Sequence, residues 1–369
     1  MQKRALGKTG LQVSVLGFGG FHLVEIASAE AARLLGAYLD QGGNYIETAA
    51  EYGTGISEAK IGKAVSHRRA DYVLATKSLQ RTRQGFLNEL DRSLCNLKTD
   101  HVDVMFVHGV QAAADVDQIL APGGALEGAR EALQAGKLRF LAVSGHGRPD
   151  ALLAAVRRFD FDVLMTGFNY YDKFNYPGIE EELLPLCQER GVGVIAMKSL
   201  ADGYLYRSPE PALRYSLSLP VATVAAGINS AAMLETDLGI VSRFTPMSEA
   251  EKEELYRTAP ELGSYVCRLC GKCRTADFDP QKVFLLEGVF DRQMDDMRVT
   301  DTAQYALQER LKNWFAQAEL ARTKYEALAA KVDPSKDYGA LSPLCPYGID
   351  VDRKLKIAHG KLSREPYLA

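Results

Sequence analysis

Four polar side chains of the types that catalyse carbonyl chemistry follow consecutive apolar runs in the first third of the sequence. Glu47 ends one run and Tyr52 follows it closely, whereas Lys77 and His108 follow the next two runs. A phenol can donate a proton to a carbonyl oxygen while a hydride reaches the carbon, and this is general acid catalysis. The combination of a phenol, an ammonium, a carboxylate and an imidazole therefore predicts a site for carbonyl reduction.

Each of these groups has a definable task in such a site. Tyr52 would be the acid, but a tyrosine with an ordinary pKa of about 10 is a slow donor without help. The ammonium of Lys77 would stabilise the phenolate, and Glu47 would pair with this otherwise costly buried charge. His108 would hydrogen-bond the same carbonyl oxygen and orient the substrate.

A second group of reactive residues lies near the C-terminus. Cys267, Cys270 and Cys273 form a C-x2-C-x2-C motif, and Cys345 is followed directly by Pro346. Three close cysteines with a remote Cys-Pro form the bacterial ferredoxin pattern, in which thiolates hold a 4Fe-4S cluster. Four thiolates also suit zinc, but the usual zinc spacing is a pair of C-x2-C knuckles. We therefore predict that these four cysteines bind a 4Fe-4S cluster.

The elements that must position these residues show a regular alternation. Short apolar, β-branched runs alternate with amphipathic stretches, which is typical of parallel strands joined by crossover helices. The predicted strands are 15–18, 45–48, 72–76, 102–107, 140–144, 163–168, 194–197 and 223–226. Eight such units predict a closed (β/α)8 barrel, since open doubly wound sheets usually have fewer strands. Chemistry in such a barrel sits at the C-terminal ends of the strands.

The alternation stops after the eighth unit, and the rest of the chain has a different pattern. We predict a barrel at 1–245 and a helical, ferredoxin-like extension at 246–369 that carries the cysteines. Helical periodicity in the extension predicts helices at 248–262 and 302–328. The predicted fold class is therefore α/β, a (β/α)8 TIM barrel with a helical C-terminal extension that carries an iron-sulfur site.

Composition and charge limit the classes of partner. The chain has 369 residues, of which 47% are hydrophobic and 25% charged, as in an ordinary globular protein. A net charge of −3 gives no electrostatic reason to expect nucleic acid or an anionic membrane. No apolar run approaches a signal sequence or a membrane span of about 20 residues. We expect a cytoplasmic protein that acts on a small molecule, with a redox partner if the cluster transfers electrons.

Several segments also resemble the aldo-keto reductase family. NYIETAAEYGTGISEAKIG is similar to the family signature around the catalytic tyrosine, and LATKS and VDVMFVHG are similar to its lysine and histidine strands. The resemblance runs to about residue 241 and implies the same roles for Tyr52, Lys77 and His108. Glu47 stands where the family has an aspartate, and the extra methylene moves the carboxylate at a site sensitive to shifts of about 1 Å. The tail resembles the extension of a family branch with a C-terminal 4Fe-4S motif.

The resemblance also implies that a nicotinamide cofactor lies across the barrel mouth. The residues that match or replace the family's cofactor contacts are Ser144, Thr166, Gly227, Asn229 and Ser230, and Lys198 is an atypical candidate for a phosphate contact. Gly145 replaces an asparagine of the family, and Met233 and Asp237 replace an arginine and an asparagine. Because a ribose 2'-phosphate is normally bound by Arg or Lys, both NADP and NAD stay open as cofactors.

The leading prediction is an NAD(P)H-linked oxidoreductase that interconverts a small carbonyl compound, sugar-derived compounds included, and its alcohol. Two other functions are alternatives to this prediction. A redox-neutral lyase or epimerase would reuse Tyr52, Lys77 and His108 as acid and base, and the altered Glu47 motivates this alternative. A non-catalytic iron-sulfur electron-transfer protein would use the barrel as a scaffold. A cluster moves one electron and a nicotinamide two, so the cluster's role, structural or electron-transferring, stays open.

Overall fold

A closed barrel of parallel strands forms the first part of the molecule. The computed structural model describes residues 1–292 and 317–364. Within them, eight parallel strands close in the order β10-β3-β4-β5-β6-β7-β8-β9. The strands are β3 (Leu16–Gly19), β4 (Tyr45–Glu47), β5 (Val73–Ser78), β6 (Val102–Val107), β7 (Leu138–Ser144), β8 (Val163–Gly167), β9 (Gly193–Met197) and β10 (Thr223–Gly227). The predicted (β/α)8 barrel is confirmed.

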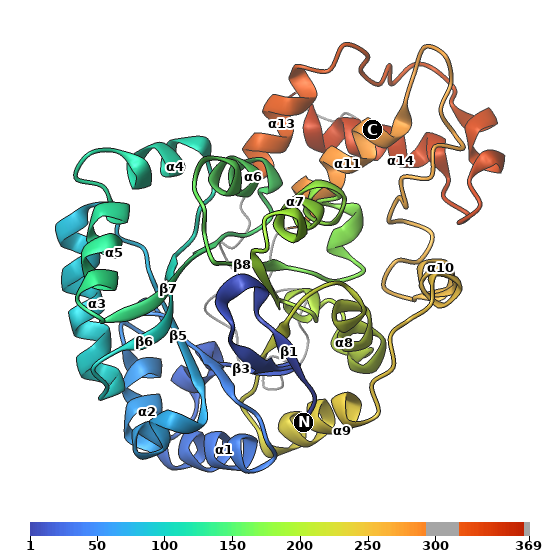
Figure 1. Cartoon of the computed structure of the whole chain (residues 1–369). Helices are drawn as coiled ribbons and strands as arrows, with labels where there is room; N and C mark the ends of the chain where they lie inside the picture. The colour runs from blue at the N-terminus through green and yellow to red at the C-terminus, as the bar shows by residue number, and fades with distance from the viewer. Residues whose placement is uncertain (293–316, 365–369) are drawn as a thin grey trace. The chain divides into compact units, whose positions relative to one another are not determined.

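Helices surround this barrel (Figure 1). They are α1 (Ser28–Asp40), α2 (Ile56–Val65), α3 (Arg83–Leu97), α4 (Ala113–Leu120), α5 (Ala125–Gln134), α6 (Pro149–Arg158), α7 (Leu184–Glu189), α8 (Pro209–Ser218) and α9 (Ala231–Ser242). Side chains at alternate strand positions fill the barrel interior, as a strand period of two requires. Val104 and Phe106 of β6 and Val163 and Met165 of β8 are examples.

An antiparallel hairpin closes the floor of the barrel. β1 (Lys3–Ala5) pairs with β2 (Gln12–Ser14), and Leu6 between them packs into the barrel core. The hairpin, dark blue in Figure 1, is tied to the start of β9 by a hydrogen bond from the Lys8 amide to the Gly191 carbonyl at 2.8 Å. The floor is therefore built by the chain's own N-terminus.

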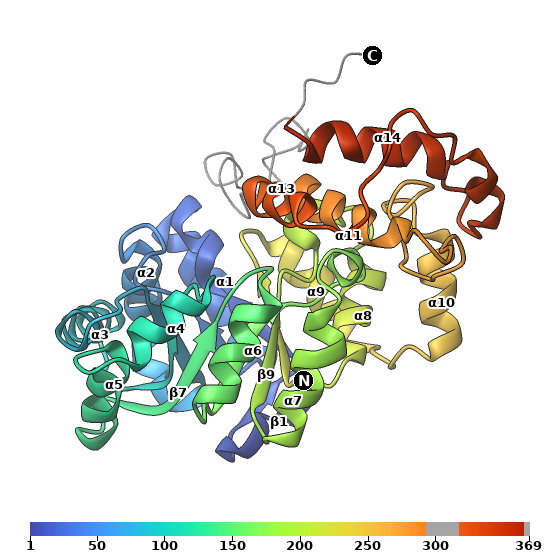
Figure 2. The same ribbon diagram turned by 90° about the horizontal axis from the view of Figure 1, so that it is seen from above.

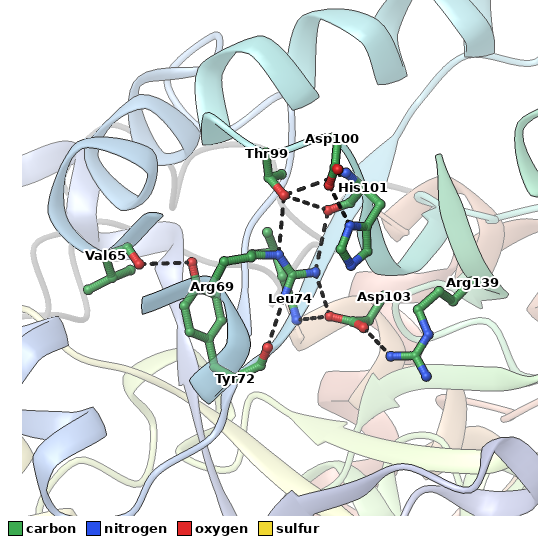
Figure 3. Close-up of polar contacts among 9 residues, drawn as sticks. All are labelled: Val65, Arg69, Tyr72, Leu74, Thr99, Asp100, His101, Asp103 and Arg139. Carbon is green, nitrogen blue, oxygen red and sulfur yellow. Dashed lines mark hydrogen bonds and ion pairs between the residues drawn. The ribbon is translucent and has the colours of Figure 1, made fainter. Parts of the chain in front are cut away.

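A charged network stabilises the start of β6 (Figure 3). Asp103 is buried and accepts hydrogen bonds from Arg69 at 2.7 Å and Arg139 at 2.6 Å, and from the backbone amide of Leu74 at 2.9 Å. Burial raises the pKa of Asp103, but Arg69 and these hydrogen bonds outweigh it and hold the pKa below its ordinary value. The network lies at the opposite end of the strands from the predicted catalytic residues. We infer that it contributes to stability.

The contacts divide the chain into two compact units, and the second contains the helical C-terminal part. This unit comprises Tyr170–Pro177, Asp202–Leu205 and Met247–Ala369. Its described helices are α10 (Glu249–Thr258), α11 (Pro280–Asp291), α13 (Ala318–Glu326) and α14 (Val351–Leu362), and α11 packs against α13 and α14 (Figure 2). The predicted helix at 302–328 lies outside the described residues up to 316, and α13 falls in the remainder. In the described ranges, no helix has the length and apolar character needed to cross a membrane.

A buried arginine ties distant segments of this second unit together. Arg292, directly after α11, pairs with Asp172 at 2.6 Å and with Asp202 at 3.0 Å, and its side chain is 0% exposed. Asp172 belongs to the segment that follows β8, and Asp202 to the segment that follows β9. The ion pairs of Arg292 therefore join three segments of the second unit that are far apart in the sequence.

Candidate functional site

Lys77 is the centre of the predicted catalytic group. Its side chain is 1% exposed at the end of β5, and its Nζ donates to the Tyr52 hydroxyl at 2.8 Å and to the Thr48 carbonyl at 2.9 Å. Nζ also forms an ion pair with Glu47. A buried ammonium is tolerated only when it is paired and hydrogen-bonded, and these three acceptors meet that need. The structure thus brings Glu47, Tyr52 and Lys77 together as the sequence predicted.

The pairing of β4 with β5 explains why these groups meet. Parallel pairing sets Glu47 beside Ala75, so Lys77 extends past the end of β4 toward the loop that carries Tyr52. The ring of Phe21 packs edge-on against the Tyr52 ring, with centroids 4.9 Å apart. The sequence analysis did not single out Phe21, because an aromatic residue after the first strand carries no signal of its own.

Burial and charge act in opposite directions on the coupled pair. Burial alone lowers the pKa of Lys77, but the Glu47 carboxylate and Tyr52 outweigh it and hold the pKa above its ordinary value. Burial raises the pKa of Glu47, and the neighbouring ammonium opposes this only in part. Lys77 is therefore a permanent cation beside the phenol at neutral pH.

His108 completes the group from the end of β6. Its ring centroid lies 6.1 Å from that of Tyr52 and 6.5 Å from that of His146. Burial, followed by the charge of Lys77, holds the pKa of His108 well below its ordinary value, so the imidazole is neutral. Nδ1 of His108 is buried and has no hydrogen-bond partner in the described part of the chain. A neutral imidazole can donate a hydrogen bond to a ligand oxygen without adding charge.

Ser144 and Thr166, which were predicted to contact the cofactor, lie at the ends of β7 and β8, and Lys198, predicted as a possible phosphate contact, follows β9. The Ser144 hydroxyl is buried without a hydrogen-bond partner among the described residues, whereas Thr166 donates to the Gly145 carbonyl at 3.0 Å. Lys198 follows β9 in the left-handed conformation, with a φ of 56°. The next residue, Ser199, has a second buried hydroxyl that lacks a partner within the described ranges. Sequence reasoning missed Ser199, since a serine after an apolar strand is common.

The residues predicted for the phosphate end follow β10. Gly227 pairs with Gly19 of β3, and a Cβ at Gly227 would lie 2.1 Å from the His22 ring, so a larger residue would require the His22 side chain to move. Asn229 is half-buried beyond the strand, and the Ser230 hydroxyl caps α9 by accepting from the Met233 amide at 3.3 Å. The N-terminus of α9 favours an anion there.

Asp237 stands farther along α9, at the position where the resemblance implies an asparagine. It is a buried residue, and burial raises its pKa to about 7. A carboxyl group at this place offers no positive charge to a ribose 2'-phosphate.

The four predicted cluster cysteines line one cavity in the second unit. Cys267, Cys270, Cys273 and Cys345 share this cavity, although residues 274–344 separate the triplet from the last cysteine. Cys273 belongs to the hydrophobic core of the unit, against which Cys267 and Cys345 also pack. Among the described residues, no three His, Cys, Asp or Glu side chains are grouped in the geometry of a metal-ion site. The four cysteines thus line one cavity, but their side chains are not arranged as the ligands of a metal ion.

Comparisons with known proteins agree with the fold. The profile of the Aldo/keto reductase family matches residues 15–215. The chain is 30% identical over 221 residues to the uncharacterized oxidoreductase YqkF of Bacillus subtilis, a match that covers 57% of this chain and 68% of YqkF. It is 30% identical over 231 residues to L-galactose dehydrogenase of Arabidopsis thaliana, covering 57% and 69% of the two chains.

A solved structure with a similar fold is the holo form of aldo-keto reductase AKR11C1 from Bacillus halodurans. The TM-score is 0.61 at 29% identity, with 69% of this chain and 95% of that chain covered. The matched profile spans more than half of the sequence and includes the four predicted catalytic residues, Lys77 among them. The chain therefore belongs to the aldo/keto reductase family and is an oxidoreductase of the aldo-keto reductase type.

Proposed function

We propose that the barrel interconverts a small carbonyl compound and its alcohol, with NAD or NADP as the hydride carrier. The observation that carries this proposal is the 2.8 Å hydrogen bond between the buried Lys77 ammonium and the Tyr52 hydroxyl. This contact stabilises a phenolate, so the Tyr52 hydroxyl can release its proton to a carbonyl oxygen. Glu47 keeps Lys77 charged and in place.

The proposed reaction balances one hydride and one proton. A bound nicotinamide would supply the hydride to the carbonyl carbon, or accept it in the reverse direction. Tyr52 gives the proton to the oxygen and draws a proton from solvent afterwards. His108, neutral at neutral pH, holds the carbonyl oxygen by a hydrogen bond and so fixes the face that is attacked.

The fit of a nicotinamide rests on polar atoms that lack partners. The hydroxyls of Ser144 and Ser199 are both buried and unpartnered among the described residues. An unsatisfied buried polar group costs about 1–3 kcal/mol, which a ligand amide would recover. These two serines suit the carboxamide of a nicotinamide, while Asn229 and Ser230 lie at the α9 N-terminus for the phosphates.

A sugar-derived substrate is included in the proposal. The similarity to L-galactose dehydrogenase supports a small polyhydroxy substrate. The C-terminal end of the strands also offers polar groups, because the ring centroids of His108 and His146 lie 6.5 Å apart there. Hydrogen-bond donors of this kind favour substrates with several oxygens.

The test measures nucleotide binding and turnover separately. Wild-type protein purified without oxygen should bind NADH or NADPH by calorimetry and oxidise the nucleotide with members of an aldehyde and sugar panel. Tyr52→Phe should lower kcat about 10²–10⁴-fold and leave the nucleotide Kd unchanged. The matched control is Tyr45→Phe, because the buried Tyr45 hydroxyl has no partner in the described ranges. Equal losses in both variants, or no nucleotide binding, would overturn the proposal, and product without nucleotide oxidation would favour the redox-neutral alternative.

We also propose that residues 246–369 hold a 4Fe-4S cluster on Cys267, Cys270, Cys273 and Cys345. The motif spacing and the shared cavity support this ligand set. Such a cluster supplies one-electron chemistry, or a structural cross-link between the triplet and the end of the chain. The catalytic barrel would then be residues 1–245, in line with the sequence prediction.

Metal analysis tests the cluster directly. Anaerobically purified protein should contain iron and acid-labile sulfide in the proportion of one 4Fe-4S cluster, with an EPR signal after reduction. Cys345→Ser should abolish this content, whereas Cys95→Ser should retain it, because Cys95 lies on α3 of the barrel. Stoichiometric zinc without sulfide would contradict the cluster.

A further inference from the structure

Arg268 is a buried cation inside the cysteine motif. The residue lies between Cys267 and Cys270, lines the same cavity as the four cysteines, and is only 6% exposed. Its guanidinium donates to backbone carbonyls alone, to Tyr256 at 3.1 Å, to Leu262 at 3.2 Å and to Val266. In the described part of the chain, no carboxylate pairs with it.

The groups that face this guanidinium are aromatic or thiol groups. Its central carbon lies 4.8 Å from the centroid of the Tyr347 ring. Tyr347 offers the cation the face of its ring, which is a cation–π contact and not an ion pair. The other groups that could oppose the charge are the four cysteines, which line the same cavity as Arg268. The cysteines are therefore the available source of a counter-charge.

An unpaired buried charge is costly. The effective penalty of placing one ion in the protein interior is several kcal/mol, and pairing with an opposite charge offsets it. Neutral thiols do not provide that charge, whereas thiolates bound to a metal cluster do. The surroundings of Arg268 are thus complete only when the cavity holds an anionic group.

We propose that Arg268 is the counter-charge of a thiolate-bound cluster in this cavity and that it stabilises the reduced state of that cluster. This inference rests on the proposed 4Fe-4S site and deepens it. Reduction adds one negative charge to the cluster, and a nearby cation in a low-dielectric environment favours that added charge. Arg268 is a positioning residue, since it acts on the cysteine ligands rather than on a substrate.

Two other cations near the motif sharpen the argument, because Lys354 and Arg274 each have a carboxylate partner, Glu287 and Asp279. Lys354 of α14 is also buried, but it pairs with Glu287 at 2.5 Å, so its charge is already balanced. Arg274 follows Cys273 directly, but its side chain is 66% exposed and solvent screens its charge. Arg268 combines burial with the lack of a carboxylate partner.

The test is the reduction potential of the cluster in the full-length protein. Arg268→Gln removes the charge but keeps donors for the backbone carbonyls, and the matched control is Arg274→Gln. We expect Arg268→Gln to lower the ratio of reduced to oxidised cluster at a fixed potential about tenfold, equivalent to about 59 mV for one electron. Arg274→Gln should leave the ratio unchanged, and Arg268→Lys, which keeps the charge, should restore most of it.

The outcomes separate this inference from the cluster proposal. Equal potentials for wild type and Arg268→Gln, both loaded with iron and sulfide, would overturn the role of Arg268 while the cluster stands. Protein without iron and sulfide would overturn both. If Arg268→Gln does not bind the cluster, the reduction potential of cluster-loaded Arg268→Lys decides the case. An unchanged potential supports the role of the positive charge, and a strongly shifted potential contradicts it.

Discussion

At the scale of single residues, the barrel end contains two kinds of buried polar group. Lys77 has three acceptors and is fully satisfied, so its position is fixed before any ligand arrives. Nδ1 of His108 and the hydroxyls of Ser144 and Ser199 lack partners among the described residues. Since buried polar groups in native proteins are normally hydrogen-bonded, these exceptions near the C-terminal ends of the strands support the proposed ligand site.

The neutral state of His108 predicts how stability depends on pH. The pKa of His108 lies well below that of an unfolded histidine, because burial and then Lys77 disfavour the charged form. Below about pH 6.5 the unfolded chain therefore binds a proton that the folded chain does not, and stability falls as the pH falls. Above that pH the contribution is constant.

His108→Asn should remove this loss of stability at acid pH. Urea unfolding at pH 7.5 and pH 5.5 should show the variant gaining about 1.4 kcal/mol relative to wild type at the lower pH, for one unit below the unfolded pKa. His67→Gln is the control, since His67 is exposed and folding changes its surroundings little. Parallel pH curves for wild type and His108→Asn would show that the imidazole is charged in the folded protein.

At the scale of elements, the N-terminal hairpin depends on a close approach to the start of β9. Gly7 has a φ of 53°, and a Cβ there would lie 2.2 Å from the backbone nitrogen of Gly193. Backbone atoms cannot move aside as a flexible side chain can. Gly10 of the same hairpin also has a positive φ, 76°, but a Cβ there would meet nothing within 4 Å.

These two glycines give a matched pair of variants. Gly10→Ala should lower the free energy of unfolding by about 1–2 kcal/mol, because a residue with a Cβ is strained in the left-handed conformation. Gly7→Ala should cost clearly more, because the same strain is joined by a backbone clash that opens the barrel floor. Denaturant midpoints measure both values. Equal costs would show that the hairpin does not rest on β9 as described.

At the scale of the whole molecule, one buried ion-pair node holds the second unit together. Arg292 joins Asp172 and Asp202, which are far from it in the sequence, and all three side chains are buried. Arg364 in the same unit also pairs with two carboxylates, Glu319 and Glu326, but its side chain is 56% exposed. The two arginines therefore differ mainly in burial.

Loss of the buried arginine should be the more harmful change. Arg292→Met removes the cation that pairs with two buried carboxylates and should destabilise the second unit by about 3–5 kcal/mol. Arg364→Met should cost no more than about 1 kcal/mol, because exposed ion pairs contribute little. Scanning calorimetry tests both predictions by the unfolding temperature of the second unit, with the unfolding transition of the barrel as the reference. Similar unfolding temperatures for the two variants would contradict the buried node.

The sequence predicted the features that depend on local patterns of residues, such as the strands and the residues at their ends. The alternation of apolar runs and helical stretches predicted every barrel strand to within two residues of its ends, because strand and helix periods are local properties. The rule that parallel strands end on one face then predicted that Glu47, Lys77 and His108 would share a site. Tyr52, which follows the strand of Glu47, was predicted to join them, and in the structure its hydroxyl lies 2.8 Å from the Lys77 Nζ.

Other features of the molecule were decided by the tertiary structure alone. Phe21 against Tyr52, the unpartnered Ser199 and the grouping of Asp172 and Asp202 around Arg292 involve segments brought together by folding. Ordinary residue types at these positions leave no local pattern to read. The sequence by itself determined which chemical groups are present and which elements carry them, whereas burial and pairing, which set their charge states, arise only when distant segments pack and exclude water.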